Sequence, residues 1–470
     1  MPTHPQAYRP EAALLDLGPT LSDPVEAADF PQTILRFRND RAAAQVGLDT
    51  LTDTEWTQAF GRFAPLPGTL PQPLALRYHG HQFRQYNPDI GDGRGFTFAQ
   101  MRDDRDRLID LGTKGSGQTP YSRFGDGRLT LKGGVREILA TEMLEALNVP
   151  TSRTLSLIET GEALTRGDEP SPTRSAVMVR LSHGHIRIGT FQRLAYLQDE
   201  EGMRALVRYV LHSLYGEASD DPIRLLDHVV TRTATLAARY MAAGFVHGVL
   251  NSDNINVTGE SFDYGPWRFA PTWDPAFTAA YFDHAGLYAF GRQPEAIHWD
   301  VMQLAASLRL IAESDPLIAP LEQFGPRYQP RITEALLWRL GVAARAPEED
   351  RALVQAMERA LRTSATPMDR FFFDAFGGDL PATYGPEWDM VRTALAPYAP
   401  RKDRSHAYWQ GSPCSMLIDE VEAIWAPIAE ADDWSALHAK VAAIRTMGEA
   451  LAGGEALAGG GAPAGGGAPA

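Results

Sequence analysis

Short apolar runs separated by glycine clusters characterise the chain between residues 78 and 193. Four of these runs, over residues 95–101, 107–114, 154–160 and 175–181, have the length of strands and are rich in β-branched and other apolar residues. Glycine and polar clusters bound them, as is typical of the turns that join strands. The pattern therefore predicts a sheet whose strands are separated by glycine-containing turns.

One amphipathic helix interrupts these strands over residues 133–150. Its apolar positions recur every three or four residues, which is the spacing that gives a helix one buried face. Pro150 ends the pattern, because proline cannot continue a helix. The apolar positions are Val135, Ile138, Leu139, Met143 and Leu147.

From about Leu197 onward the apolar spacing becomes helical, with amphipathic segments over residues 201–216, 226–245 and 297–313. Gly244 closes the second of these segments, as glycine often does at a helix C-terminus. A further helix near the end of the chain is predicted to dock on the rest of the protein through one apolar face. That face carries Trp434, Leu437, Val441, Ile444 and Leu451.

The order of these patterns predicts an α+β chain of two lobes, a small sheet-rich N-lobe followed by a large helical C-lobe, with extensions at both ends. A cleft between two such lobes is a natural nucleotide site. The tail is rich in Gly, Ala and Pro, so it is predicted to be a disordered tether. The predicted segments are an N-terminal extension over 1–75, the N-lobe over 76–195, the C-lobe over 196–425, a C-terminal helix over 426–452 and the tail over 453–470.

Composition narrows the class of protein. Hydrophobic residues make up 44% and charged residues 22% of the 470 residues, which is typical of a globular protein with a substantial core. The formal net charge of −15 argues against non-specific nucleic-acid binding, since such binding needs Lys and Arg to neutralise phosphates. A single cysteine, Cys414, excludes an internal disulfide. Because neither a membrane-length apolar run nor a signal-peptide pattern is found, we expect a cytoplasmic protein with no membrane partner.

The stretch HGVLNSDNINVTGESFDYGP, residues 247–266, resembles the catalytic segment of protein kinases with one letter changed. In the kinase template, an Asp five residues before the metal-binding Asn is the catalytic base. Counting back five residues from Asn254 gives Val249, which cannot accept a proton. Asp253 could serve as the base from a different direction, and this would imply a differently oriented nucleotide.

Asn254 and Asp263 are the candidate ligands for a divalent metal ion. Mg²⁺ takes oxygen ligands and keeps several waters, so one amide oxygen and one carboxylate suffice beside nucleotide phosphates. A short hairpin over residues 255–262 would bring both side chains to one ion. The histidines of residues 79–81 and 183–185 lack further ligands at metal spacing, and we interpret them as local or core histidines.

Other parts of the kinase template occur in the expected order. The glycine loop GDGRG, residues 91–95, would cover the phosphates, Lys114 would hold them and Glu137 would pair with that lysine. Each part also has an ordinary interpretation. GDGR favours a tight turn and recurs at Gly125, and a lone lysine is usually solvated. A glutamate early in a helix is stabilised by the positive end of the helix dipole. Asp263 could instead cap a turn. The order and spacing of the set favour a kinase-like nucleotide site.

Arg180 and Arg187 form a pair that ordinary kinases lack. They are seven residues apart in a segment rich in glycine and histidine, and they could converge on one anion. Guanidinium groups grip phosphate oxygens through two parallel hydrogen bonds. The alternative is a solvated pair.

Four long strings make the chain resemble the selenoprotein O family, whose bacterial members are called YdiU-type proteins: YHGHQFRQYNPDIGDGRG, LGTKGSGQTPYSRFGDGRLTLKGGVREIL, SHGHIRIGTF and HGVLNSDNINVTGESFDYGP. The resemblance covers roughly residues 30–420. It implies a protein kinase-like fold that binds its nucleotide in a flipped orientation, so that the α-phosphate faces the acceptor. The implied reaction transfers AMP from ATP to Ser, Thr or Tyr hydroxyls of proteins and releases pyrophosphate. UMP transfer from UTP is also associated with the family, and the implied metal is Mg²⁺ or Mn²⁺.

The resemblance also implies roles for individual residues. Lys114 would hold phosphate and pair with Glu137, while Arg180 and Arg187 would grip the outer phosphates that leave as pyrophosphate. Asp253 would accept the proton of the attacking hydroxyl. The remaining residues implied at the nucleotide and its metal are Gly91, Gly93, Arg94, Asp126, Gly127, Asn254 and Asp263, the last two as metal ligands.

Two other functions remain open, a phosphotransferase acting on a protein or small molecule and a catalytically silent nucleotide-binding scaffold. Val249 in the place of the kinase base disfavours the first, and the intact metal ligands disfavour the second. Family members often carry a cysteine or selenocysteine close to the C-terminus, whereas this chain ends in a Gly/Ala/Pro tail. We therefore interpret Cys414 as structural or incidental.

Overall fold

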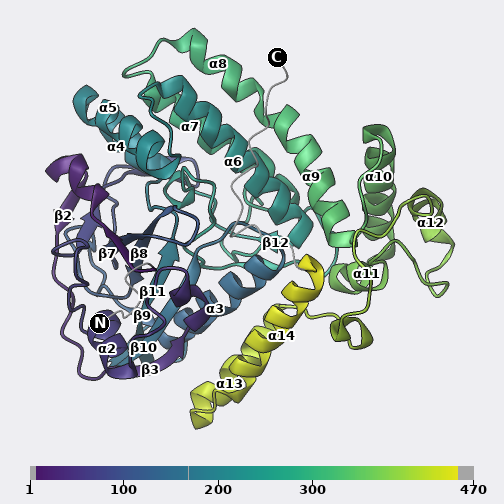
Figure 1. Ribbon diagram of the computed structural model, residues 1–470, viewed down its shortest axis with the longest axis horizontal. Helices are drawn as coiled ribbons and strands as arrows, with labels where there is room; N and C mark the ends of the chain where they lie inside the picture. Colours follow the sequence, from purple (N-terminus) through teal and green to yellow (C-terminus); the bar gives the residue numbers. More distant parts are fainter. Residues whose placement is uncertain (1–6, 168, 454–470) are drawn as a thin grey trace.

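The computed structural model describes residues 7–167 and 169–453, so the predicted tail beyond Gly453 lies outside the described residues. A nine-stranded sheet forms one part of the molecule and a set of helices forms the other (Figure 1). None of the described helices combines the length and the apolar character needed to span a membrane. The fold is α+β, and most of the strands precede most of the helices along the chain, as the sequence predicts.

The strands of the sheet run in the order β2-β4-β7-β8-β11-β10-β3, and β1 and β9 pair with β7 and β11. The four predicted strands are confirmed, and they correspond to β7, β8, β10 and β11, which are adjacent at the centre of the sheet. Strands at the centre of a covered sheet carry long apolar runs, and this is why the sequence revealed them. The strands are β1 Arg9–Glu11, β2 Ser22–Pro24, β3 Ile34–Arg38, β4 Leu74–Leu76, β5 Gly80–Gln82, β6 Gln85–Asn87, β7 Thr97–Arg102, β8 Leu108–Lys114, β9 Leu129–Thr130, β10 Arg153–Leu164, β11 Thr173–Ser182, β12 Phe245–Val246 and β13 Arg268–Phe269.

Residues 7–75 take part in the sheet. They supply both edge strands, β2 and β3, and the helix α2 (Asp53–Gly61) packs on β10 and β11. The ring of Phe63 makes edge-to-face contacts with Phe96 and Phe98 at centroid distances of 5.2 and 5.4 Å. The stretch expected to be an extension thus forms two edges and part of one covering layer of the sheet.

The helix that interrupts the strands, α3 (Leu131–Ala146), packs against β10 and β11. The side chain of Thr130 caps its N-terminus by accepting a hydrogen bond from the backbone N–H of Gly133. The helix ends before Asn148, whose φ of 61° cannot continue it, and Pro150 follows. The predicted helix and its buried stripe are therefore confirmed.

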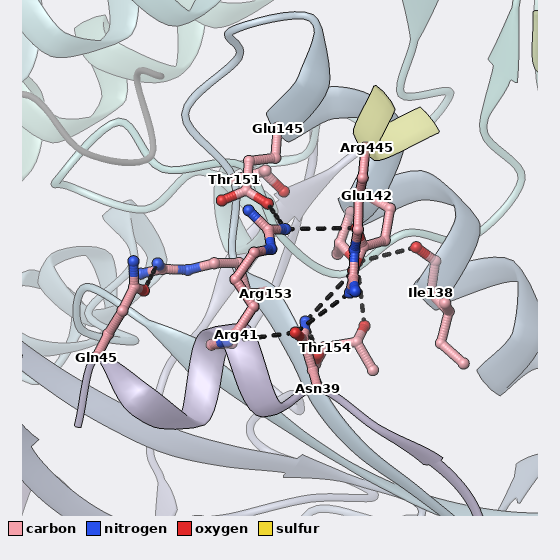
Figure 2. A network of polar contacts seen from close by, with 12 residues as sticks. Asn39, Arg41, Gln45, Ile138, Glu142, Glu145, Thr151, Arg153, Thr154 and Arg445 are labelled. Atoms are coloured by element: carbon pink, nitrogen blue, oxygen red, sulfur yellow. Dashed lines mark hydrogen bonds and ion pairs between the residues drawn. The ribbon is translucent and has the colours of Figure 1, made fainter. Parts of the chain in front are cut away.

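The two last helices, α13 (Ile418–Ala431) and α14 (Ser435–Ala452), pack on α3 and are drawn in yellow-green to yellow in Figure 1. Figure 2 shows the polar network at this contact. Arg445 of α14 donates through Nε and Nη2 to the two carboxylate oxygens of Glu142 on α3, at 2.8 and 2.6 Å. Asn39 donates to the same buried carboxylate at 3.3 Å. The predicted docking helix is confirmed. Its ion pair with Glu142 joins it to α3, the helix that carries the candidate site residue Glu137.

The helical part is arranged around one long buried helix, α6 (Pro222–Ala243). The other helices are α1 Asp40–Ala44, α4 Ile188–Tyr196, α5 Glu200–Tyr209, α7 Gln293–Leu308, α8 Ser314–Glu322, α9 Phe324–Leu340, α10 Pro347–Ser364, α11 Met368–Asp374 and α12 Asp389–Leu395. α6 packs against α7, α8 and α9. Gly244 ends α6 in the left-handed conformation with φ 71°, as predicted, because glycine adopts it without a Cβ clash.

The hairpin predicted over residues 255–262 is wrong. Asn256 forms an isolated antiparallel bridge with Arg187, and Ser261 forms an isolated parallel bridge with Thr151. The two sides of the segment therefore pair with other parts of the chain instead of with each other. A local pattern cannot reveal such pairing, because the partners are distant in sequence.

Candidate active site

A cavity of about 740 Å³ lies where β8 and β11 meet the segment that follows α6. Its volume is in the range of small-molecule sites. All but two of the candidate residues line it, and the exceptions are Glu137 and Asn254. The candidates in the lining are Gly91, Gly93, Arg94, Lys114, Asp126, Gly127, Arg180, Arg187, Asp253 and Asp263.

Lys114, the last residue of β8, joins two carboxylates. Its Nζ contacts Oε1 of Glu137 on α3 and lies 2.9 Å from Oδ1 of Asp263. Lys114 and Glu137 are almost fully buried, so this lysine is not a solvated surface residue. Glu137 lies beyond the first turn of α3, and the helix dipole therefore does not account for its position. The sheet, α3 and the segment after α6 meet at this ion pair.

Arg180 projects from β11 into the same cluster. Its Nη1 is 3.5 Å from Oδ1 of Asp263, and its Nε donates to Nε2 of His185 at 3.2 Å. Nδ1 of His185 faces a carboxylate oxygen of Asp110 at 3.2 Å. Burial lowers the pKa of His185, so the ring is neutral and can accept from the guanidinium while it donates to the carboxylate. The histidine therefore orients Arg180 instead of repelling it.

Arg187 lies at the N-terminal boundary of α4 and is buried between two aromatic rings. Its guanidinium carbon is 4.2 Å from the ring centre of Tyr78 and 5.1 Å from that of Phe262. Its Nη2 lies 3.1 Å from Oδ1 of Asp92, the acidic residue of the first GDGRG loop. Within the described part of the chain, its buried Nε has no hydrogen-bond partner. The guanidinium is thus positioned by two rings and one carboxylate, and its unpaired Nε can donate a hydrogen bond to a bound anion.

Asp253 is buried in the wall of the cavity, and its surroundings raise its pKa to about 6, chiefly because burial penalises the charged form. Oδ2 accepts a hydrogen bond from the side chain of Gln82 at 3.4 Å, whereas Oδ1 has no partner among the described residues. The strand pair β5–β6 packs directly on this residue, so that a Cβ at Gly80 would lie 2.9 Å from Oδ1. The candidate base is therefore confined by a strand pair that the sequence pattern did not predict.

Asn254 does not line the cavity, but its amide is oriented by the backbone. Nδ2 donates to the carbonyl oxygen of Val249 at 2.9 Å, which leaves the amide oxygen as the acceptor. No three His, Cys, Asp or Glu side chains cluster as a metal site within residues 7–167 and 169–453. A cation here would thus rely on Asn254, Asp263 and phosphate oxygens, which is a donor set that suits Mg²⁺.

Asp263 has two features of a functional residue. Its φ of 65° is in the left-handed region, which costs a non-glycine residue on the order of 1 kcal/mol or more. Burial alone would raise its pKa, but the positive charges of Lys114, Arg180 and Arg187 hold that pKa well below its usual range. The carboxylate is therefore ionised at any physiological pH and able to bind a cation.

The second GDGR copy contributes to the cavity mouth. Asp126 is held by both terminal nitrogens of Arg166, at 2.8 and 3.0 Å, and this ion pair keeps the pKa of Asp126 low although burial would raise it. Gly127 has a φ of 71°, and a Cβ there would lie 2.2 Å from the backbone of Gly117. Only glycine permits this approach, so the sequence is a tight turn and also part of the cavity wall.

Cys414 lies apart from this cavity. It is half-buried beside Trp409, and its backbone N–H donates to the hydroxyl of Tyr408 at 3.1 Å. Burial raises the pKa of its thiol, which disfavours the reactive thiolate.

Residues that sequence reasoning missed are Tyr78, Gln82, Asp92 and Phe262, together with the approach of Gly80 to Asp253. All four lie within the strings that carry the family resemblance, and Asp92 is also the acidic residue of a loop already chosen for its glycines.

Known proteins match most of this chain. A family profile described as protein adenylyltransferase SelO matches residues 6–410. A relative from Synechococcus elongatus, named protein nucleotidyltransferase YdiU, is 44% identical over 94% of this chain and 96% of its own length. Relatives with the same name from Synechocystis sp. and Azotobacter vinelandii are 43% and 36% identical, over 90% and 78% of this chain and 95% and 74% of their own lengths. The arrangement of basic and acidic side chains around one cavity thus occurs in a chain that belongs to the SelO family of protein adenylyltransferases.

Proposed function

We propose that this protein transfers AMP from ATP to a Ser, Thr or Tyr hydroxyl of a protein substrate and releases pyrophosphate, within a kinase-like two-lobed fold. UMP transfer from UTP is the alternative donor reaction. The observation that carries the proposal is the arrangement at residues 249–254. Val249 offers only its backbone carbonyl, whereas Asp253 presents a buried carboxylate to the cavity. A base displaced from the kinase position suits a nucleotide bound with a different phosphate facing the acceptor.

In the proposed reaction, the substrate hydroxyl oxygen bonds to the α-phosphorus as the bond from that phosphorus to the bridging oxygen of the β-phosphate breaks. Asp253 accepts the hydroxyl proton, and Oδ1 is the oxygen with no partner among the described residues. Pyrophosphate leaves with the electron pair of the broken bond. Because the pKa of Asp253 is about 6, the carboxyl is mostly ionised at neutral pH. This pKa is also close to the working pH, where a general base is most effective.

Lys114, Arg180 and Arg187 would hold the triphosphate from the protein side. Their side chains are between 4% and 6% exposed, so their positions are fixed before the nucleotide binds. Fixed positive charge stabilises a leaving pyrophosphate most where its negative charge develops. Asp92 and Glu137 would keep two of these cations in place while the reaction proceeds.

Asn254 and Asp263 would hold Mg²⁺ or Mn²⁺, which would supply positive charge at the phosphate oxygens. Asp263 already carries the ionised carboxylate that such an ion requires. This carboxylate lies 2.9 Å from Nζ of Lys114, and it would contact both the lysine and the metal when the nucleotide binds.

Labelled nucleotides separate this function from the two alternatives. The protein is incubated with ATP labelled at the α- or the γ-phosphate, with Mg²⁺ or Mn²⁺, and the label on protein is followed. Label from the α-position alone supports nucleotidyl transfer, label from the γ-position alone would show a kinase, and ATP binding with no label would show a scaffold. The same assay with α-labelled UTP compares the two donors.

The Asp263→Ala variant tests the metal assignment. We expect it to abolish α-label transfer, because it removes the charged metal ligand. Asp315→Ala, which removes an exposed carboxylate on α8, is the matched control and should transfer like the wild type. Wild-type transfer by Asp263→Ala would show that the metal is bound elsewhere.

A further inference from the structure

The cavity has two ends of different chemistry. At the inner end, Lys114, Arg180 and Arg187 are each at most 6% exposed. At the mouth, the lining comes from the loop over residues 121–128 and from Thr165 and Arg166 in the β10–β11 connection. A triphosphate is drawn to the buried cations, so the nucleoside of a bound nucleotide lies toward the mouth.

Phe124 is the one aromatic residue of this mouth that is fully exposed to solvent among the residues that line the cavity. The other two aromatic residues of the lining are engaged with the protein. Tyr78 lies under the guanidinium of Arg187, and Tyr121 contacts the carboxylate of Asp23 through its hydroxyl. Within the described part of the chain, Phe124 stacks on no other ring or guanidinium group. A ring left in water at the mouth of a ligand cavity is available to a ligand.

The loop that carries Phe124 is held by its own hydrogen bonds. The side chain of Gln118 donates to the carbonyl of Gly125 at 2.8 Å, and the backbone N–H of Gly117 donates to the carbonyl of Gly127 at 3.2 Å. The exposed ring is thus mounted on a structured turn, which lowers the entropic cost of using it to bind a ligand.

Arg166 brings a second planar group to the same mouth. Both terminal nitrogens donate to Asp126, and Nη1 also donates to the carbonyl of Thr165 at 3.1 Å. These contacts fix the orientation of its guanidinium, which is 24% exposed. Two segments far apart in sequence, the second GDGR turn and the β10–β11 connection, are joined by this ion pair.

We propose that Phe124 and Arg166 form the nucleobase subsite of the cavity, with the base stacked on the aromatic ring and the guanidinium plane. The inference rests on the proposed function, since it assumes a nucleotide with its phosphates at the inner end. Aromatic rings and guanidinium planes are the groups on which proteins stack bases. A purine offers a larger face than a pyrimidine, so this subsite favours ATP over UTP.

The test compares the binding of ATP, UTP and inorganic tripolyphosphate in the presence of Mg²⁺, by calorimetry on the full chain. Because stacking on an aromatic side chain contributes to the affinity for a base, Phe124→Ala should weaken ATP binding about ten-fold. Tripolyphosphate has no base and should bind the variant and the wild type equally. Unchanged ATP affinity, or an equal loss for ATP and tripolyphosphate, overturns the subsite.

Two further variants sharpen the test. Arg166→Lys keeps a cation for Asp126 but removes the guanidinium plane, and it should lose ATP affinity as Arg166→Ala does. Full ATP affinity in Arg166→Lys would limit Arg166 to an ionic role and overturn its part in the subsite. Tyr281→Ala removes an aromatic ring that is 84% exposed and does not line the cavity, and it should bind all three ligands like the wild type.

Failure of the subsite and failure of the proposed function give different results. If wild-type protein transfers α-label but Phe124→Ala binds ATP normally, the function holds and the subsite is wrong. If Phe124→Ala loses ATP affinity selectively but the wild type transfers only γ-label, the subsite holds and the direction of transfer is wrong.

Discussion

Replacing Gly80 with alanine tests whether Asp253 is the base without altering any charged group. A Cβ at this position would lie 2.9 Å from both Cβ and Oδ1 of Asp253. Ordinary contacts of this kind are about 3.5 Å or longer, so the Asp253 side chain would have to move by roughly 0.6 Å together with the backbone that carries its Cβ. Gly80 does not have a positive φ, and alanine therefore adds no backbone strain there. The perturbation is a small displacement of Asp253 relative to β5.

The size of the effect follows from this displacement. A misplacement of about 1 Å in a reacting group costs on the order of 10²-fold in rate, so a shift of half that size should lower kcat about ten-fold. The affinity for ATP should not change, because the cations that hold the phosphates are untouched. We therefore expect a loss in kcat at saturating ATP, with the dissociation constant of ATP and the melting temperature close to the wild-type values.

The assay measures initial rates of α-label transfer, ATP affinity and thermal unfolding on the same preparation. Gly325→Ala is the matched control, since a Cβ there meets no atom within 4 Å. A folded Gly80→Ala variant with wild-type kcat, together with normal transfer by Asp253→Asn, would refute the assignment of Asp253 as the base.

Three further predictions concern groups around the site. Glu137→Gln should lower kcat/KM by about 10²-fold while the protein stays folded, since a neutral amide no longer fixes the buried lysine that it contacts; steady-state kinetics and melting curves check this. Transfer should rise with pH as Asp253 loses its proton, with an acid limb near pH 6, because the pKa is raised from the ordinary range; a pH–rate profile that stays flat between about pH 5 and 7 would contradict it. Arg445→Ala should lower the free energy of unfolding by about 3 kcal/mol, because it leaves the buried carboxylate of Glu142 short of its main partner. Lys132→Ala, which removes a more exposed ion pair of the same helix contact, should cost less than about 1 kcal/mol in denaturant titrations.

The elements that could be predicted from the sequence are those with long, regular apolar patterns. β7, β8, β10 and β11 each have at least six residues and lie at the centre of the sheet, and α3, α6 and α14 have an unbroken buried stripe. β1, β2, β4, β5 and β6 have only three residues each, which is too short for an alternation to be recognised. β5 and β6 pair with each other, whereas β1, β2 and β4 exist because strands distant in sequence pair with them. The same reason explains the wrong hairpin, whose two sides bridge to segments far away in sequence.

The candidate site likewise contains residues that could be selected from the sequence and residues that could not. Lys114, Glu137 and Asp263 could be selected because the kinase template fixes their order along the chain, and the structure brings the three side chains together. Gln82 could not be selected, since it reaches Asp253 across 171 residues of sequence and has no counterpart in the kinase template. Asp92 was hidden for a different reason. A Gly-Asp-Gly sequence is explained by a turn alone, so its ion pair with a buried arginine leaves no separate trace.

The substitution of valine for the kinase base does not by itself argue for an inactive enzyme. In the kinase template one aspartate precedes the metal-binding asparagine by five residues and supplies the base. Here the backbone carbonyl of Val249 orients Asn254, a contact that any residue at this position can make. The carboxylate is supplied four residues later by Asp253, which is buried against Gly80 and keeps one oxygen without a partner in the described chain. Burial of a carboxylate with one oxygen unpaired is costly, and a residue without function at this position would gain stability by being apolar. The cost is consistent with use of this oxygen in the reaction, and the proposed function therefore assigns the base to Asp253 in place of the acid that is missing at position 249.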